Sequence, residues 1–317
     1  MGERDWDQLD LLRQRCRLVL ERGKQLWAVA AYIEYRLCLE APGPWAARTL
    51  ETGSGRFALG PLPEVASSSH TWAELAPYLQ GTPQAAMAAH ERVVRGEDLS
   101  KDVTALSLPA VLDLPLRLAD WEPRYPLAEY GPDEVSAPAP ALPPLEALPV
   151  LALPVLDERR DQDAAAIDAP GREVISALEE LAANWTTESN GRAEAVAVAG
   201  GAVDAVRALG ARPVQMVQLS SSAALAQMAW AAATGGAHGR RRGAAAGRFG
   251  AWSVLAALSG RGEDWAANEI AFCDAAISTR WYAWANQEPV TGWALHLALE
   301  TAGPSVRAFA LAAVDAF

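Results

Sequence analysis

A segment rich in glycine and arginine, residues 235–248, carries residue types suited to holding an anion. It reads GGAHGRRRGAAAGR and is called the Gly/Arg turn below. Glycines let backbone N–H groups approach a ligand, a helix that begins after the turn adds unpaired donors, and arginine grips phosphate or carboxylate with two parallel hydrogen bonds. We therefore expect a binding protein for a small anionic, phosphate-bearing ligand, with these contacts: Gly236, Gly239, Arg240, Arg241, Arg242 and Arg248.

The charge distribution supports the same segment. Residues 205–262 contain seven arginines and no Asp or Glu, which gives this stretch a charge of +7. The whole chain has a net charge of −12. The rest of the chain is therefore at −12 − 7 = −19. The alternative interpretation is that these arginines pair with acids elsewhere in the chain. Consecutive helical residues point about 100° apart, so three arginines in a row cannot all grip one ligand.

A second hypothesis is an enzyme that acts on a phosphorylated or carboxylated substrate. His238 or His70 would be the base, Glu122 its partner, and the arginines an electrostatic clamp. This hypothesis requires that those side chains converge in one pocket. His90 lies one helical turn from Met87 and Val94, which indicates a core or boundary histidine instead.

A third hypothesis is an interaction or scaffold protein whose Gly/Arg turn docks an acidic partner or a second copy of the chain. The apolar sequence AFALAAVDAF at residues 308–317 favours self-association, and a homo-oligomer is one expected outcome. All three hypotheses stay open at this point.

Other motifs are weaker. Residues 53–58, GSGRFA, match a GxGxxA pattern, but they follow an expected helix and not a strand, so a dinucleotide fingerprint is not expected. The chain has no GxxxxGK[ST], HExxH or GxSxG motif and no histidine pair at metal spacing. We therefore expect no metal site, and the sequence identifies no cofactor.

Composition limits the partners. A pI near 4.9 disfavours long nucleic acid and anionic membranes. No apolar run reaches the roughly 18 residues that a membrane span needs, and the first residues, MGERDWDQLD, are acidic where a secretory leader is basic. We expect a cytoplasmic protein without membrane contact.

The elements that must position these residues divide into three parts. Residues 1–108 are predicted to form an N-terminal helical lobe, beginning with one helix from about residue 6 to residue 40 that kinks at Gly23. Residues 109–165 hold most of the prolines and predict an extended strap, with residues 121–126 packed down. Residues 166–317 predict an Ala/Trp-rich helical lobe.

Within the last part, alternating β-branched residues predict strands over 195–199 and 213–219 with a helix between them. Helices are predicted over 222–233, 247–258, 264–286, 292–300 and 305–315. The fold class is mainly α (α+β), two helical lobes with one small strand–helix–strand element. The tryptophans of the C-terminal lobe are predicted to be core: Trp230, Trp252, Trp265, Trp281, Trp284 and Trp293.

Several phrases of the chain resemble those of a conserved bacterial protein family of unknown function. They are GRFALGPLPE (55–64), HTWAEL (70–75), WEPRYPLAEY (121–130), GGAHGRRRGAAAGRF (235–249), RWYAW (280–284) and TGW (291–293). The resemblance extends over nearly the whole chain. It implies that the strap and the Gly/Arg turn belong to one architecture, and it supplies no catalytic residue.

Overall fold

The computed structural model describes residues 5–22, 26–142, 168–211, 214–262, 265, 267–286, 292–302 and 307–316. The chain divides into two compact units. Unit 1 contains Met1–Leu118, Leu127–Pro138 and Arg241–Ala245. Unit 2 contains Ala119–Pro126, Ala139–Arg240 and Ala246–Phe317. The division predicted at residues 108 and 165 stays a prediction, because residues 143–165 lie outside the described part.

Unit 1 is built mainly from helices, as its apolar periodicity predicts. Thr82 caps one of them through a 3.1 Å hydrogen bond from the Ala85 N–H to its Oγ1, with Pro83 in the first turn. The helices are α1 (Trp6–Glu21), α2 (Trp27–Glu40), α3 (Gly43–Thr49), α4 (Leu62–Ser69), α5 (Trp72–Leu75), α6 (Pro83–Val94) and α7 (Val103–Leu106), with a 3₁₀ turn at Ala76–Tyr78.

The helix predicted over residues 6–40 is two helices and not one. The backbone leaves the helical conformation at Arg22 and enters α2 after Leu26. The two helices end and begin on either side of Gly23, the position where the kink was predicted. Residues 23–25 themselves lie outside the described part.

The described part of the predicted strap, residues 109–142, contains one short hairpin of β1 (Glu129–Tyr130) and β2 (Val135–Ser136) and no helix. Its residues 121–126 are packed down as predicted. Trp121 lies 5.4 Å from the ring of Trp252, and Tyr125 is buried. Prolines prevent residues 121–126 from forming a helix or strand, whereas the aromatic side chains of these residues bury apolar surface that holds them against the protein.

Unit 2 is built on a five-stranded antiparallel sheet in the order β3-β7-β6-β5-β4. The strands are β3 (Arg192–Ala199), β4 (Val214–Leu219), β5 (Arg280–Asn286), β6 (Gly292–Glu300) and β7 (Arg307–Ala316). The helices are α8 (Ala169–Glu180), α9 (Ala183–Thr187), α10 (Ala202–Ala208), α11 (Ser221–Ala233), α12 (Ala244–Ser259) and α13 (Glu269–Ser278). The first two residues of α12 are assigned to unit 1.

The helices predicted over residues 292–300 and 305–315, and over the end of 264–286, are wrong. These residues form the central strands β5, β6 and β7. Ala and Leu dominate β6 (GWALHLALE) and β7 (RAFALAAVDA), and both residue types favour a helix in isolation. Because helices cover both faces of these strands, apolar residues occupy consecutive positions and the alternation typical of a half-buried strand is absent. The protein is therefore a mixed α+β protein, and its C-terminal part is not a helical lobe.

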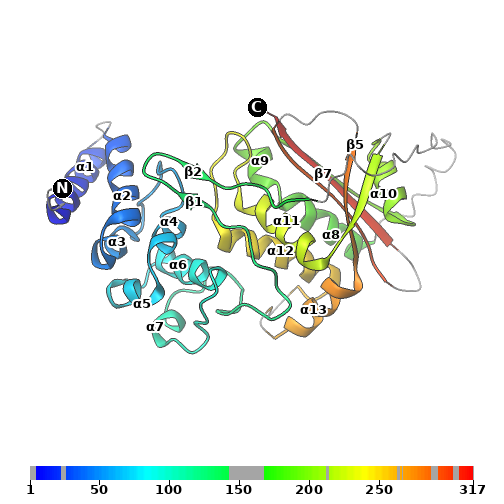
Figure 1. Cartoon of the computed structure of the whole chain (residues 1–317), viewed down its shortest axis with the longest axis horizontal. Helices are drawn as coiled ribbons and strands as arrows, with labels where there is room; N and C mark the ends of the chain where they lie inside the picture. Colours follow the sequence, from blue (N-terminus) through cyan, green and yellow to red (C-terminus); the bar gives the residue numbers. More distant parts are fainter. Residues whose placement is uncertain are drawn as a thin grey trace. The chain divides into compact units, whose positions relative to one another are not determined.

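Helices cover both faces of this sheet (Figure 1). On one face, α10 packs against Trp284, Ala298 and Ala310. On the other face, Trp293 of β6 stacks on Trp230 of α11 at 5.2 Å, and α8 and α9 pack there as well. Of the predicted core tryptophans, Trp293 is half-buried and the other five are buried.

Candidate functional site

Several backbone N–H groups of the Gly/Arg turn donate to side chains of the same chain. In its unit 2 portion the acceptors are Asp315 for the N–H of Ala237 (2.5 Å), the Ser189 hydroxyl for that of His238 (3.1 Å) and Glu188 for that of Arg240 (3.1 Å). Two of the three are carboxylates. These three N–H groups therefore bind acceptors within the chain, beside the predicted contacts Gly236 and Gly239.

The unit 1 portion of the turn shows the same arrangement around Glu64, which is fully buried. Arg241 donates to both of its carboxylate oxygens, from Nε at 2.8 Å and from Nη2 at 2.7 Å. The Tyr130 hydroxyl and the Ala244 N–H also donate to it, at 2.6 and 3.2 Å. This set of contacts, together with those of Glu91 below, is called the Glu64 cluster.

A second carboxylate, Glu91 of α6, lies in the Glu64 cluster. It accepts from the Ala245 N–H at 2.9 Å and from Arg95 at 2.7 Å. Gly243 makes room for it: the backbone there has φ +102°, and a Cβ would lie 2.5 Å from Glu91 Oε1. Burial and then the charge of Glu64 raise the pKa of Glu91 to about 7, against the lowering effect of Arg95.

Arg248 forms the matching pair in unit 2. Its Nε and Nη2 each donate to Glu122 at 2.7 Å, and both side chains are completely buried. The hydroxyl of Tyr125, the indole N–H of Trp252 and the N–H of Ala119 complete this Glu122 cluster. Burial alone would raise the pKa of Glu122, but the hydrogen bonds and charge of Arg248 bring it below its ordinary value.

The remaining predicted ligand contacts lie at the surface or against these acids. His238, Arg240 and Arg242 are exposed. Gly236 lies against the carboxylate of Asp315 and Gly239 against the side chain of Glu188. Of the predicted arginines, Arg241 and Arg248 are thus engaged in buried pairs, as the alternative interpretation of the charge pattern expects.

The predicted catalytic residues do not form a pair within either unit. Glu122 and His238 belong to unit 2, where Glu122 is committed to Arg248 and His238 faces solvent. His70 belongs to unit 1 and follows the end of α4. Burial lowers its pKa, which the charge of Glu74 partly offsets.

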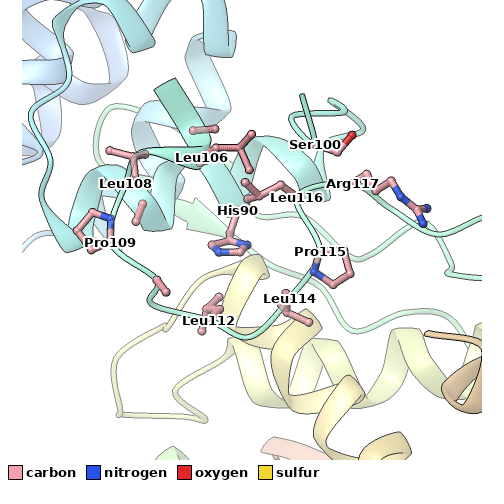
Figure 2. A pocket seen from close by; sticks show the side chains of 14 residues that line it. His90, Ser100, Leu106, Leu108, Pro109, Leu112, Leu114, Pro115, Leu116 and Arg117 are labelled. Carbon is pink, nitrogen blue, oxygen red and sulfur yellow. The ribbon is translucent and has the colours of Figure 1, made fainter. Parts of the chain in front are cut away.

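Sequence reasoning missed a cavity of about 380 Å³ in unit 1, which is called the His90 pocket. One wall is α6, which contributes His90, and the other is the segment 108–117, which follows α7. Figure 2 shows this segment curving around the His90 imidazole, with Leu108, Pro109, Leu112 and Leu114 on the curve. Most of the lining is apolar, and His90 is 6% exposed.

The sequence explains why the cavity forms. Residues 108–117 read LPAVLDLPLR, in which prolines prevent a helix and leucines hold the irregular backbone against α6. His90 faces inward because it follows Ala86 and precedes Val94 on the buried face of α6. The signal was the spacing of prolines among leucines, which we interpreted only as a strap.

The polar side chains at the pocket differ in direction. The His90 imidazole lies at the centre of the curve, whereas the Arg117 guanidinium points away from it (Figure 2). The Ser100 hydroxyl donates to Asp98 at 2.6 Å, which leaves its lone pairs as acceptors. The pocket thus combines an apolar wall with one imidazole, a side chain that carries both hydrogen-bonding nitrogens of histidine.

The described residues offer neither a membrane span nor a set of metal ligands. Within the part of the chain that the structure describes, no helix combines the length and the apolar character that a bilayer crossing demands. The same residues contain no group of three His, Cys, Asp or Glu side chains placed to hold a metal ion.

Comparison with known proteins places the chain without assigning a role. No curated protein and no solved structure matches it. A family described as a family of unknown function (DUF6183) matches residues 2–316. That match spans nearly the whole chain and includes both the Gly/Arg turn and the residues of the His90 pocket, so the protein belongs to this family of unknown function.

Proposed function

We propose that this protein binds a small, mostly apolar ligand in the His90 pocket. The observation that carries the proposal is the cavity of about 380 Å³ lined by leucines, prolines and alanines around one imidazole. Small-molecule sites in proteins are typically clefts of roughly 300–1,000 Å³ with apolar walls and a few polar groups that fix orientation. The His90 pocket fits that description in size and in lining.

The His90 imidazole determines which polar group the ligand is expected to carry. A hydroxyl or carbonyl group can exchange one hydrogen bond with His90 while the hydrocarbon part displaces water from the leucines. A fully charged group is disfavoured inside the pocket, because the Arg117 guanidinium points away from it and an unpaired charge loses its hydration there. The expected ligand is neutral or carries its charge outside the pocket.

The hypothesis of an anionic ligand at the Gly/Arg turn stays a prediction. The occupation of its backbone donors by Asp315, Glu188, Glu64 and Glu91 counts against it, while the exposed Arg242 leaves it testable. The enzyme and self-association hypotheses also stay predictions, and no contact described above favours either of them.

A matched pair of probes tests the His90 pocket. p-Cresol and p-xylene have almost the same shape and differ in one hydroxyl group, and p-toluate adds a charge. We expect p-cresol to bind more tightly than p-xylene by about two- to tenfold, the value of one net hydrogen bond, and p-toluate to bind weakest. Isothermal titration calorimetry and thermal shift measure the three affinities.

Two variants assign the binding to this cavity. Leu112→Trp fills it and abolishes binding of both p-cresol and p-xylene, whereas Leu59→Trp, at an exposed leucine outside the pocket, leaves binding unchanged. His90→Leu removes the preference for p-cresol and keeps p-xylene binding. The proposal fails if neither neutral probe binds, or if Leu112→Trp binds them like the unaltered protein.

A further inference from the structure

A second cavity, of about 330 Å³, lies in unit 1 and carries a different set of groups. It is lined by α1, by α2 and by the loop between α3 and α4, and is called the Trp27 pocket. Its lining residues are Arg17, Trp27, Ala30, Ala31, Glu34, Gly53, Arg56 and Phe57. The loop is the GSGRFA segment, and α3 precedes it, so it is no part of a strand–turn–helix dinucleotide motif.

Two aromatic rings at this pocket are partly exposed to solvent. Trp27 is 44% exposed and Phe57 is 42% exposed, and their ring centroids lie 4.6 Å apart. The guanidinium of Arg56 lies 5.4 Å from the Phe57 ring and is exposed. Among the described residues, no carboxylate pairs with Arg56. Exposed rings beside such a cation form a surface on which a planar anionic ligand can stack.

The inner side of the pocket contains a buried acid. Glu34 is 4% exposed, and its Oε2 accepts the Gly55 N–H at 2.7 Å. Arg17 is held beside it by Glu51, by the Ser54 hydroxyl at 3.1 Å and by the Thr52 carbonyl at 3.2 Å. Because each carboxylate oxygen has two lone pairs, Glu34 can accept further N–H groups besides that of Gly55.

The conformation of the loop requires glycine at position 55. Gly55 has φ +76°, and a Cβ there would lie 2.6 Å from the Leu62 side chain, so the chain needs glycine at this position. The loop places the exposed Arg56 and Phe57 at the pocket edge, while the buried Glu34 lies at its inner side. The pocket therefore presents a stacking surface, a cation and a hydrogen-bond acceptor to one ligand.

We propose that the Trp27 pocket binds a guanine nucleotide. The base would stack on Trp27 and Phe57, its adjacent ring N–H and amino groups would donate to Glu34, and its phosphate would pair with Arg56. Guanine presents two neighbouring N–H donors to a carboxylate, whereas adenine presents one donor beside a ring-nitrogen acceptor, which repels it. This site is separate from the His90 pocket in its residues and in its ligand.

Isothermal titration calorimetry at pH 7.5 with GMP, AMP and inorganic phosphate tests the proposal. We expect GMP to bind, AMP to bind at least about tenfold more weakly because it lacks the second donor, and phosphate alone to give no measurable heat. Binding of phosphate as tight as that of GMP would reduce the pocket to an anion site and overturn the proposal. So would the absence of GMP binding.

Surface variants separate the contributions with little risk to folding. Phe57→Ala and Arg56→Ala are each expected to weaken GMP binding about tenfold, through lost stacking and a lost charged hydrogen bond. Tyr78→Ala and Arg15→Ala, at exposed positions outside the pocket, are matched controls with unchanged affinity. Equal GMP affinity in Phe57→Ala and the unaltered protein would contradict the stacking surface.

Glu34→Gln tests whether Glu34 contacts the base, because a residue with a purely structural role would not change the preference between GMP and AMP. The amide keeps an acceptor for Gly55 and presents one donor and one acceptor, the pattern that matches adenine. We expect the variant to lose the preference for GMP and to bind AMP more tightly. Leu112→Trp in the His90 pocket leaves GMP binding unchanged, so failure of either ligand hypothesis is visible independently of the other.

Discussion

Each compact unit contains a buried glutamate held in the same way, and the two differ in what lies next to it. Glu64 in unit 1 and Glu122 in unit 2 both receive two parallel hydrogen bonds from an arginine, one from a tyrosine and one from a backbone N–H. Glu122 balances one cation, whereas Glu64 has a second acid, Glu91, beside it.

That second acid reverses the response to pH. The pKa of Glu122 is lowered, so its contribution to stability is present above pH 4.5 and is lost as the pH falls through the folded-state pKa. The pKa of Glu91 is raised to about 7 in the folded protein. Its contribution to the stability of the fold is therefore most favourable below pH 4.5 and is lost as the pH rises towards 7. Two clusters that share the arginine, tyrosine and backbone contacts therefore respond to pH in opposite directions.

The largest effect is expected from breaking the Glu122 cluster. Arg248→Met leaves a fully buried carboxylate without its cation, which costs about 3–5 kcal/mol of the free energy of unfolding. Urea denaturation measures it. The double change Glu122→Gln with Arg248→Met removes the charge as well and is expected to recover most of the loss. A loss below 1 kcal/mol in Arg248→Met would contradict the pairing.

The pH response sharpens the comparison. Between pH 5 and pH 8, unit 1 is expected to lose up to about 3 kcal/mol of stability, because a tenfold difference in proton affinity between the folded and unfolded states corresponds to about 1.4 kcal/mol. Hydrogen exchange of peptides from α4 and α6 follows this loss, with peptides from α12 beyond residue 246 as the internal comparison. Glu91→Gln is expected to flatten the dependence, and a persistent slope in that variant would assign it to another group.

Arg241→Met is expected to cost less than Arg248→Met, about 1–3 kcal/mol. Glu64 keeps its hydrogen bonds from Tyr130 and Ala244, and Arg95 and a proton on Glu91 still compensate the charge of the pair. The same denaturation experiment compares the two variants. If Arg241→Met proves the more damaging, the second carboxylate does not buffer the cluster.

The smallest effect is expected at Arg242, between the two paired arginines in sequence. Arg242→Ala changes the free energy of unfolding by less than about 0.5 kcal/mol, because the side chain is exposed. Thermal shift with sugar phosphates and nucleotides, in parallel with Arg241→Ala, tests the anion hypothesis. A salt-sensitive stabilisation that disappears in Arg242→Ala would restore the Gly/Arg turn as a ligand site.

Local features were predictable from the sequence. The cap at Thr82, the buried tryptophans and the packing of Trp121 and Tyr125 depend on residues close in the chain or on hydrophobicity alone. Strands β3 and β4 were also predicted, because their β-branched residues alternate with small or polar ones.

The rest depends on tertiary context. Strands β5 to β7 are rich in Ala and Leu, and only their burial between two helix layers selects the extended form. The partners of Arg241 and Arg248 are 177 and 126 residues away, and a single sequence taken alone does not reveal which acid pairs with which arginine. The His90 pocket arises from irregular backbone at residues 108–117, where apolar residues follow neither the helical nor the strand period and so do not predict the shape of the chain.

The return of residues 241–245 to unit 1 has a consequence for synthesis on the ribosome. Glu64 and Glu91 emerge early, but Arg241 and the helix N–H groups that bind them are translated about 150 residues after Glu91, which takes roughly 8–30 s at about 5–20 residues per second. During that interval the nascent N-terminal part has two acids that it cannot bury at full charge. Its final packing must therefore wait until the chain has been translated past residue 245.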